Sequence, residues 1–295
     1  MPTPIALLLL VCALGMWTVD YVRMPETWSM LLLSQSLSLT NAILLCCILL
    51  RAKASSHFSL IPAILYIVTV AVFPTLRLHW LPQLIVLLLQ VFLLLTREMS
   101  DSNEPNGIVF FVSMLFCISS LFCPDALWFI VYLWVVVLIQ GSFSLRTVLA
   151  SLFAVALCGI YYFIAIYMGW LEPHDWSELV RREWFGNLRS PMLTGTIGIL
   201  ILMFFYLTGA AFRRSSYDLV STRILLYHVV MLGLLSLPLI LLSTTRSDSL
   251  AALPLFVAST ESIYLLQKES ESRGITLLIY LTVAIGLYIT LLLHL

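Results

Sequence analysis

Long runs of apolar residues, separated by short polar stretches, dominate this chain. A helix that crosses a bilayer needs about 20 mostly apolar residues, with a range of about 17 to 25. On that scale the pattern predicts an all-α polytopic transmembrane bundle of about eleven spans, or ten if the short first one is not inserted. The predicted spans are Pro4–Val19, Trp28–Leu50, His57–Leu76, Trp80–Thr96, Ile108–Cys123, Ala126–Gln140, Thr147–Trp170, Met192–Phe212, Ile224–Ser243, Leu250–Gln267 and Gly274–Leu295.

The longest polar interval, Leu171–Pro191, divides seven predicted spans from four. We therefore expect a seven-span part over residues 1–170 and a four-span part over residues 192–295, within one integral domain. Asp175 and Glu178 resemble the start of a capped helix. The apolar residues that follow recur at helical spacing, which predicts an amphipathic helix lying in the membrane interface. Its candidate contact residues are Trp176, Arg181, Arg182 and Trp184. A plain connector and a docking site for a lipid or a partner both remain open.

Lys and Arg are distributed unevenly between the two sets of predicted loops. Loops after even-numbered spans hold nine of these residues, and loops after odd-numbered spans hold six. Because loops rich in Lys and Arg stay in the cytoplasm, the count predicts a cytoplasmic N-terminus and places residues 171–191 on the outer face. The N-terminal run has neither a positive n-region nor a small-x-small cleavage site, so we interpret it as a retained helix.

Composition excludes several classes of function. Apolar residues make up 61% of the 295 residues and charged residues only 10%, which is incompatible with a soluble globular domain. The 15 basic and 15 acidic residues balance, so there is no basic footprint for nucleic acid. The six cysteines show no metal-ligand spacing, and the chain contains no nucleotide-binding or hydrolase motif. The sequence therefore predicts no metal, no cofactor and no catalytic residue.

One ionisable residue lies deep in a predicted span. Glu261 sits in the run Ser259-Thr260-Glu261-Ser262, and a carboxyl group at such a depth normally faces protein or water. The preceding predicted span runs the opposite way and brings His228 to a similar depth. A proton relay through Glu261 and His228 is one hypothesis, because histidine titrates near physiological pH. A glutamate that reaches water from a hydrogen-bonded helix end is the other.

Two predicted spans carry polar stripes at helical spacing. Ser34, Ser38 and Asn41 share one face of the second span, and Gln83 and Gln90 share one face of the fourth. Such residues commonly join membrane helices through hydrogen bonds. A polar substrate path through Ser38, Asn41, Gln83 and Gln90 is the competing hypothesis.

Charged residues also collect in the predicted outer loops. Acting together on one face, carboxylates and arginines could serve an enzyme that handles lipid-linked phosphates. Ordinary solvation of helix ends explains the same residues, and their spacing is not diagnostic. They are Asp20, Arg23, Glu26, Arg77, His79, Asp125, Arg246 and Asp248.

The stretch LLLTREMSDSNEPNGIVFFVSMLFCISSLFCPDALWFIVYLWVVVLIQGSFSLR leads from a basic loop into a short hairpin with a proline turn and returns to Arg146. In this respect the chain resembles a family of multi-pass bacterial inner-membrane proteins of about this length. The resemblance implies a polytopic membrane fold in a bacterial inner membrane and assigns no site residue.

Two classes of function follow from these observations. The first is a non-catalytic membrane subunit or scaffold that docks a partner protein or a lipid on its outer face. The second is a transporter or lipid-handling protein, either proton-coupled or acting on a lipid-linked substrate. The absence of catalytic motifs favours the first.

Overall fold

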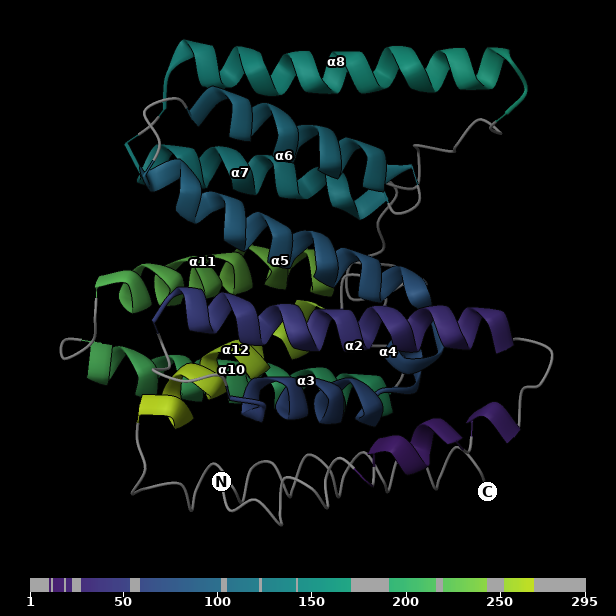
Figure 1. Ribbon diagram of the computed structural model, residues 1–295, viewed down its shortest axis with the longest axis vertical. Helices are drawn as coiled ribbons and strands as arrows, with labels where there is room; N and C mark the ends of the chain where they lie inside the picture. Colours follow the sequence, from purple (N-terminus) through teal and green to yellow (C-terminus); the bar gives the residue numbers. More distant parts are fainter. Residues whose placement is uncertain are drawn as a thin grey trace.

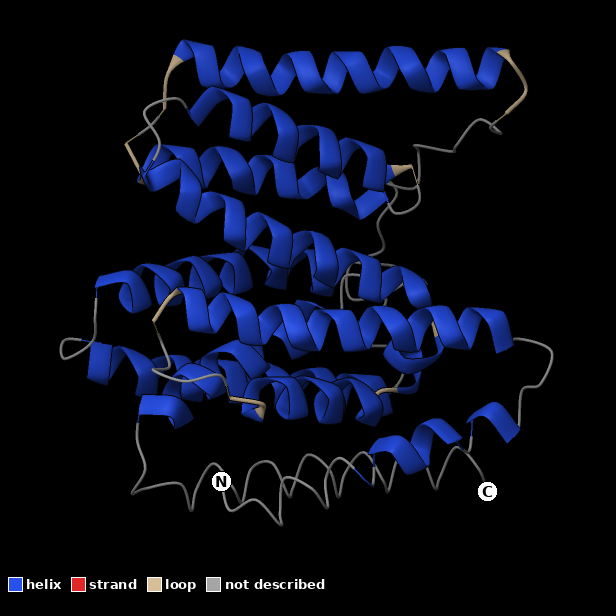
Figure 2. Cartoon of the chain, in the orientation of Figure 1, coloured by secondary structure: helices blue, strands red, loops and turns tan. Residues whose placement is uncertain are grey.

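The structure is a computed structural model that describes residues 11, 13–18, 20–22, 28–53, 59–101, 105–121, 124–141, 143–170, 191–215, 220–242 and 252–267. Regular structure within these ranges is entirely helical, without a β-strand (Figure 2). The predicted all-α fold is thus confirmed for the described part of the chain. Helices suit apolar surroundings because each one satisfies its own backbone hydrogen bonds.

The helices follow the apolar segments of the sequence closely. They are α2 (Trp28–Arg51), α3 (Ile61–Val72), α4 (Pro74–Leu78), α5 (Trp80–Asp101), α6 (Pro105–Ser120), the 3-10 helix η2 (Pro124–Leu127), α7 (Trp128–Ile139), α8 (Leu145–Tyr167), α10 (Pro191–Ser215), α11 (Val220–Leu242) and α12 (Ala252–Gln267). Helix α5 continues through Arg97–Asp101, where the sequence predicts a loop, because polarity marks the end of the apolar stretch and not the end of the helix.

The third predicted segment does not form one continuous helix. Phe73 is extended, with φ −103° and ψ 108°, and separates α3 from α4. Pro74 follows it, and a residue before proline is driven out of the helical region by the proline ring. The sixth segment differs, because η2 begins at Pro124, just before that segment, and continues into α7 without a break. A proline thus divides one apolar segment that hydropathy alone reads as a single span.

Neighbouring helices lie side by side in a long stack (Figure 1). Helices α2, α5, α7 and α10 all end on the left of the view, at the same end of the bundle. Helix α8 forms one edge of the stack and packs mainly against α6, whereas α12 packs against α3, α5, α10 and α11. The C-terminal helices therefore pack among the N-terminal ones.

The surface of this bundle is unusually apolar. Large apolar side chains are exposed along α2, α8, α10 and α11, and the largely apolar interior also contains buried serines, glutamines and a few charged residues. Among the described helices, α2, α8 and α11 are long and apolar enough to cross a membrane. These features agree with the prediction of a helical chain suited to a membrane.

Three predicted features fall wholly or partly outside the described residues. The interfacial helix over residues 171–191 lies beyond them except for Pro191, which begins α10. The segment Gly274–Leu295 also lies beyond them. Of the first predicted span, residues 11 and 13–18 are described, and all are helical.

Candidate functional site

The polar stripes on α2 and α5 face each other. The Asn41 amide nitrogen donates to the backbone carbonyl of Gln83 at 2.8 Å and lies 3.3 Å from its side-chain oxygen Oε1. Gln90 donates to the backbone carbonyl of Asn41 at 3.0 Å. All three side chains are completely buried. Three of the four residues of the hypothesised polar path, Asn41, Gln83 and Gln90, therefore hydrogen bond to one another across a helix interface.

Tyr66 of α3 completes this cluster. Its hydroxyl donates to Gln83 Oε1 at 2.7 Å, and Gln83 Nε2 donates to the carbonyl of Leu76 at 3.1 Å. Ser38 donates to the carbonyl of Ser34 in its own helix. Sequence reasoning missed Tyr66 because it lies in a uniformly apolar run. Two acceptors, Asn41 Oδ1 and Gln90 Oε1, have no hydrogen-bond partner among the described residues.

A buried ion pair lies at the end of the bundle where α2 begins. The Arg77 guanidinium donates through Nε and Nη2 to the two carboxylate oxygens of Asp20, and Nη1 donates to the carbonyl of Ala71 at 2.6 Å. The Ser34 hydroxyl lies 3.0 Å from the carbonyl oxygens of Arg77 and His79. The side chains of Arg77 and Asp20 are only 3% and 7% exposed. Both residues belong to the predicted outer-face charges, but nothing in their spacing indicates that they pair.

The other outer-face charges do not join this pair in the described structure. His79 is exposed and contributes its backbone carbonyl. The side chain of Asp125 is not described, and Arg23, Glu26, Arg246 and Asp248 lie outside the described residues. Among the outer-face charges that the structure describes, Asp20 and Arg77 therefore form a pair.

Glu261 lies in the most thoroughly buried helix of the described structure. Every residue from Ala252 to Ile263 in α12 is buried. The neighbouring hydroxyls of Ser259, Thr260 and Ser262 donate to carbonyls one turn earlier in the same helix. The Oε1 atom of Glu261 has no hydrogen-bond partner among the described residues.

His228 makes its contacts elsewhere. Its Nε2 lies 3.2 Å from the Nε2 of Gln140, which also donates to the carbonyl of Thr96, and its backbone carbonyl accepts a hydrogen bond from Tyr132 at 3.1 Å. These contacts direct His228 toward α7. Between the described side chains of Glu261 and His228 there is no hydrogen bond or ion pair. Similar depth on adjacent helices does not fix the rotation of each helix about its axis.

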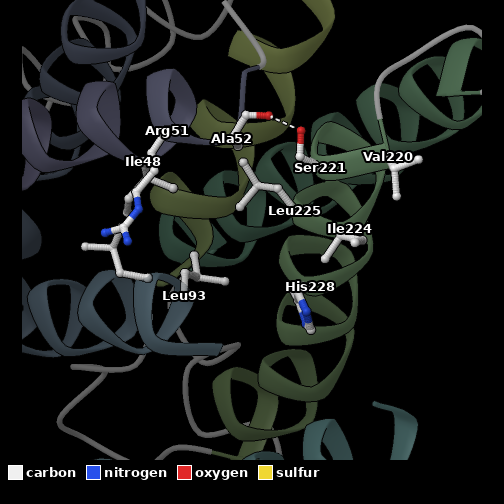
Figure 3. A pocket seen from close by; sticks show the side chains of 10 residues that line it. Ile48, Arg51, Ala52, Leu93, Val220, Ser221, Ile224, Leu225 and His228 are labelled. Carbon is white, nitrogen blue, oxygen red and sulfur yellow. Dashed lines mark hydrogen bonds between the residues drawn. The ribbon is translucent and has the colours of Figure 1, made fainter. Parts of the chain in front are cut away.

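Two pockets border α11. One, of about 240 Å³, is lined by Ile48, Arg51, Ala52, Leu93, Leu94, Val220, Ser221, Ile224, Leu225 and His228 (Figure 3). The other, of about 210 Å³, lies between α7 and the second half of α11 and is lined almost entirely by apolar and aromatic side chains. Polar groups are thus concentrated in the first pocket.

The first pocket is closed at one side by a helix-to-helix hydrogen bond. The Ser221 hydroxyl donates to the backbone carbonyl of Ala52 at 2.8 Å, as the dashed line in Figure 3 shows. Thr222 donates to the same carbonyl at 3.2 Å. These bonds fix the beginning of α11 against the end of α2. The sequence offered no signal for this pocket, because its residues come from three separate segments, and the α11 segment lies more than 100 positions after the other two.

No group of three or more His, Cys, Asp or Glu side chains in the described ranges could hold a metal ion. The candidate interface residues Trp176, Arg181, Arg182 and Trp184 lie outside those ranges. Comparisons with protein-family models, with curated proteins and with solved structures found no match to this chain.

Proposed function

We propose that this chain is an integral protein of a bacterial inner membrane and acts as a non-catalytic subunit or scaffold. The observation that carries the proposal is the closed polar cluster formed by Asn41, Tyr66, Gln83 and Gln90. Its side chains are buried and their donors are used within the bundle. A transport path needs polar groups that face water, whereas these groups hold helices together.

The membrane part of the proposal has its own support. The exposed faces of α2, α8 and α11 are rich in Leu, Ile, Phe and Tyr, and water would penalise such continuous apolar surface. Helices α3 with α4, and η2 with α7, are each too short alone for a bilayer core of about 30 Å, but together with the preceding or following turn they approach it. We therefore retain about eleven spans, with the N-terminus in the cytoplasm.

The predicted docking element is the amphipathic segment over residues 171–191. We expect the double variant Trp176→Ala and Trp184→Ala to lose a partner protein that co-purifies with the wild-type chain in mild detergent. The control is Phe143→Ala, which removes an exposed aromatic residue at the opposite end of the bundle. Co-purification would be quantified by mass spectrometry after cross-linking in membranes. Equal retention of the partner by the double variant would contradict the docking role.

A second candidate function is proton-coupled transport, favoured by one observation. Glu261 is 1% exposed and its Oε1 has no partner among the described residues. Membrane carboxyl groups of this kind often take part in proton relays.

The two functions differ in a measurable proton flux. Under the scaffold proposal, purified protein in liposomes that contain a pH-sensitive dye carries no proton flux, and Glu261→Gln behaves like the wild type. A flux in the wild type that Glu261→Gln abolishes, with expression and folding unchanged, would instead establish the transport function.

A further inference from the structure

We propose that the pocket between the end of α2 and the first two turns of α11 binds the headgroup and upper acyl chain of an anionic phospholipid. The inference requires the membrane location proposed above but not the scaffold role. It concerns the basic end of the bundle, opposite the end where α8 finishes.

The pocket is amphipathic along its length. Val220, Ser221, Ile224, Leu225 and His228 recur on one face of α11, and that face spans about 12 Å at 1.5 Å per residue. Figure 3 shows these residues on one wall, with Ile48 and Arg51 of α2 and Leu93 of α5 across from them. Arg51 and Ser221 lie at the helix ends, while most of the remaining wall is aliphatic.

Charge at the mouth favours an anion. Arg51 ends α2 and is exposed, and Lys53 follows it two residues later. Arg223, in the first turn of α11, does not line the pocket but adds a positive charge to the same end of the helix. The N-terminus of α11 adds the positive end of a helix dipole, which also favours a phosphate group. Basic pockets between membrane helices recognise anionic lipid headgroups in this way.

The aliphatic wall distinguishes a lipid from a free phosphate. Ile48, Leu93, Ile224 and Leu225 offer no hydrogen bond to a small anion, but they can pack against an acyl chain. The mouth of the pocket also lies at the ends of two helices that are long enough to cross a membrane, which is the depth of lipid headgroups. A phospholipid uses both parts of the pocket at once.

The test uses the full chain, purified in mild detergent and stripped of lipid. Phosphatidylglycerol, or phosphatidylcholine with the same acyl chains, is added, and the binding constant is obtained from the shift in thermal unfolding. We expect phosphatidylglycerol to bind and Arg51→Gln to weaken its binding about fivefold, the effect of one basic residue near a membrane surface. The matched control Arg213→Gln, which removes an exposed arginine near the end of α10, should bind as the wild type does.

A second variant tests whether lipid binding depends on the shape of the pocket as well as on its charge. Ile224→Trp narrows the pocket without changing any charge, and we expect it to weaken phosphatidylglycerol binding as well. The proposal is overturned if Arg213→Gln weakens binding as much as Arg51→Gln, if phosphatidylcholine binds equally well, or if Ile224→Trp binds like the wild type. Equal stabilisation by inorganic phosphate would also overturn it, in favour of a site for a free anion.

Discussion

Single polar residues in this protein act mainly through the partners that folding brings to them. Arg77 is the example with the most contacts, since its guanidinium engages both oxygens of Asp20 and the carbonyl of Ala71. The pair ties the segment before α2 to the end of α4. Because both side chains are removed from solvent, loss of one partner strands a charge in the interior.

We predict that Arg77→Ala lowers the free energy of unfolding by about 3–5 kcal/mol, because the Asp20 carboxylate is left buried and unpaired. Unfolding in mixed micelles with increasing SDS measures the change. Lys53→Ala, which removes an exposed cation, should have little effect. The double variant Arg77→Met and Asp20→Leu should recover most of the loss. If the double variant lost as much free energy of unfolding as Arg77→Ala does, the unpaired charge would not be the cause of the loss.

At the scale of elements, one close helix contact in this bundle depends on a glycine. Gly233 in α11 lies against the ring of Phe204 in α10, and a Cβ at position 233 would come within 2.8 Å of its Cε2 atom. Phe204 is fully buried and also packs against Phe256 of α12. The ring therefore has little room to move, and Gly233 sets how closely α10 and α11 approach.

We predict that Gly233→Leu destabilises the protein by about 1–3 kcal/mol through overpacking. Gly209→Ala is the control, because its added methyl group would meet no atom within 4 Å. That variant should be neutral or slightly stabilising, since alanine favours helix more than glycine does. Thermal unfolding in detergent compares the two. If Gly233→Leu lowers stability less in a Phe204→Ala background than in the wild type, the steric cause is confirmed. Stability losses that simply add would exclude it.

At the scale of the whole molecule, successive helices run in opposite directions, so their ends lie at the two opposite ends of the bundle. Four basic residues lie at helix ends on the left of Figure 1, namely Arg51 and Lys53 at the end of α2, Arg146 at the start of α8 and Arg213 near the end of α10. At the other end, Arg77 is neutralised by Asp20. Under the positive-inside rule, this distribution supports the proposed orientation, in which the first end faces the cytoplasm.

We predict that single cysteines in a cysteine-free background react with a membrane-impermeant maleimide according to this orientation. His79→Cys and Trp170→Cys, both at exposed positions of the outer end, should react in intact cells. Phe143→Cys and Arg213→Cys should react only after permeabilisation, because the proposed orientation places their end of the bundle in the cytoplasm. The reverse pattern would invert the proposed orientation, and equal reactivity at both ends in intact cells would contradict a spanning bundle.

The amino-acid sequence by itself determined the helical class, the apolar segments and the asymmetry of basic residues. These properties are local, because hydropathy and helix formation depend on neighbours within a few turns. It also predicted that α2 and α5 carry polar stripes, since periodicity marks a face. It placed Glu261 correctly within an apolar segment, now seen as the fully buried middle of α12.

Only the tertiary structure decided which polar groups meet. Tyr66 reaches Gln83, Asp20 reaches Arg77, and His228 turns to Gln140 and makes no hydrogen bond to Glu261. The chain separations of these pairs range from 17 to 88 residues. Apolar residues occur all around helix α11, so its sequence marks no single apolar face that would set its rotation. Packing against α5, α7, α10 and α12 sets that rotation, and with it the pocket beside Arg51.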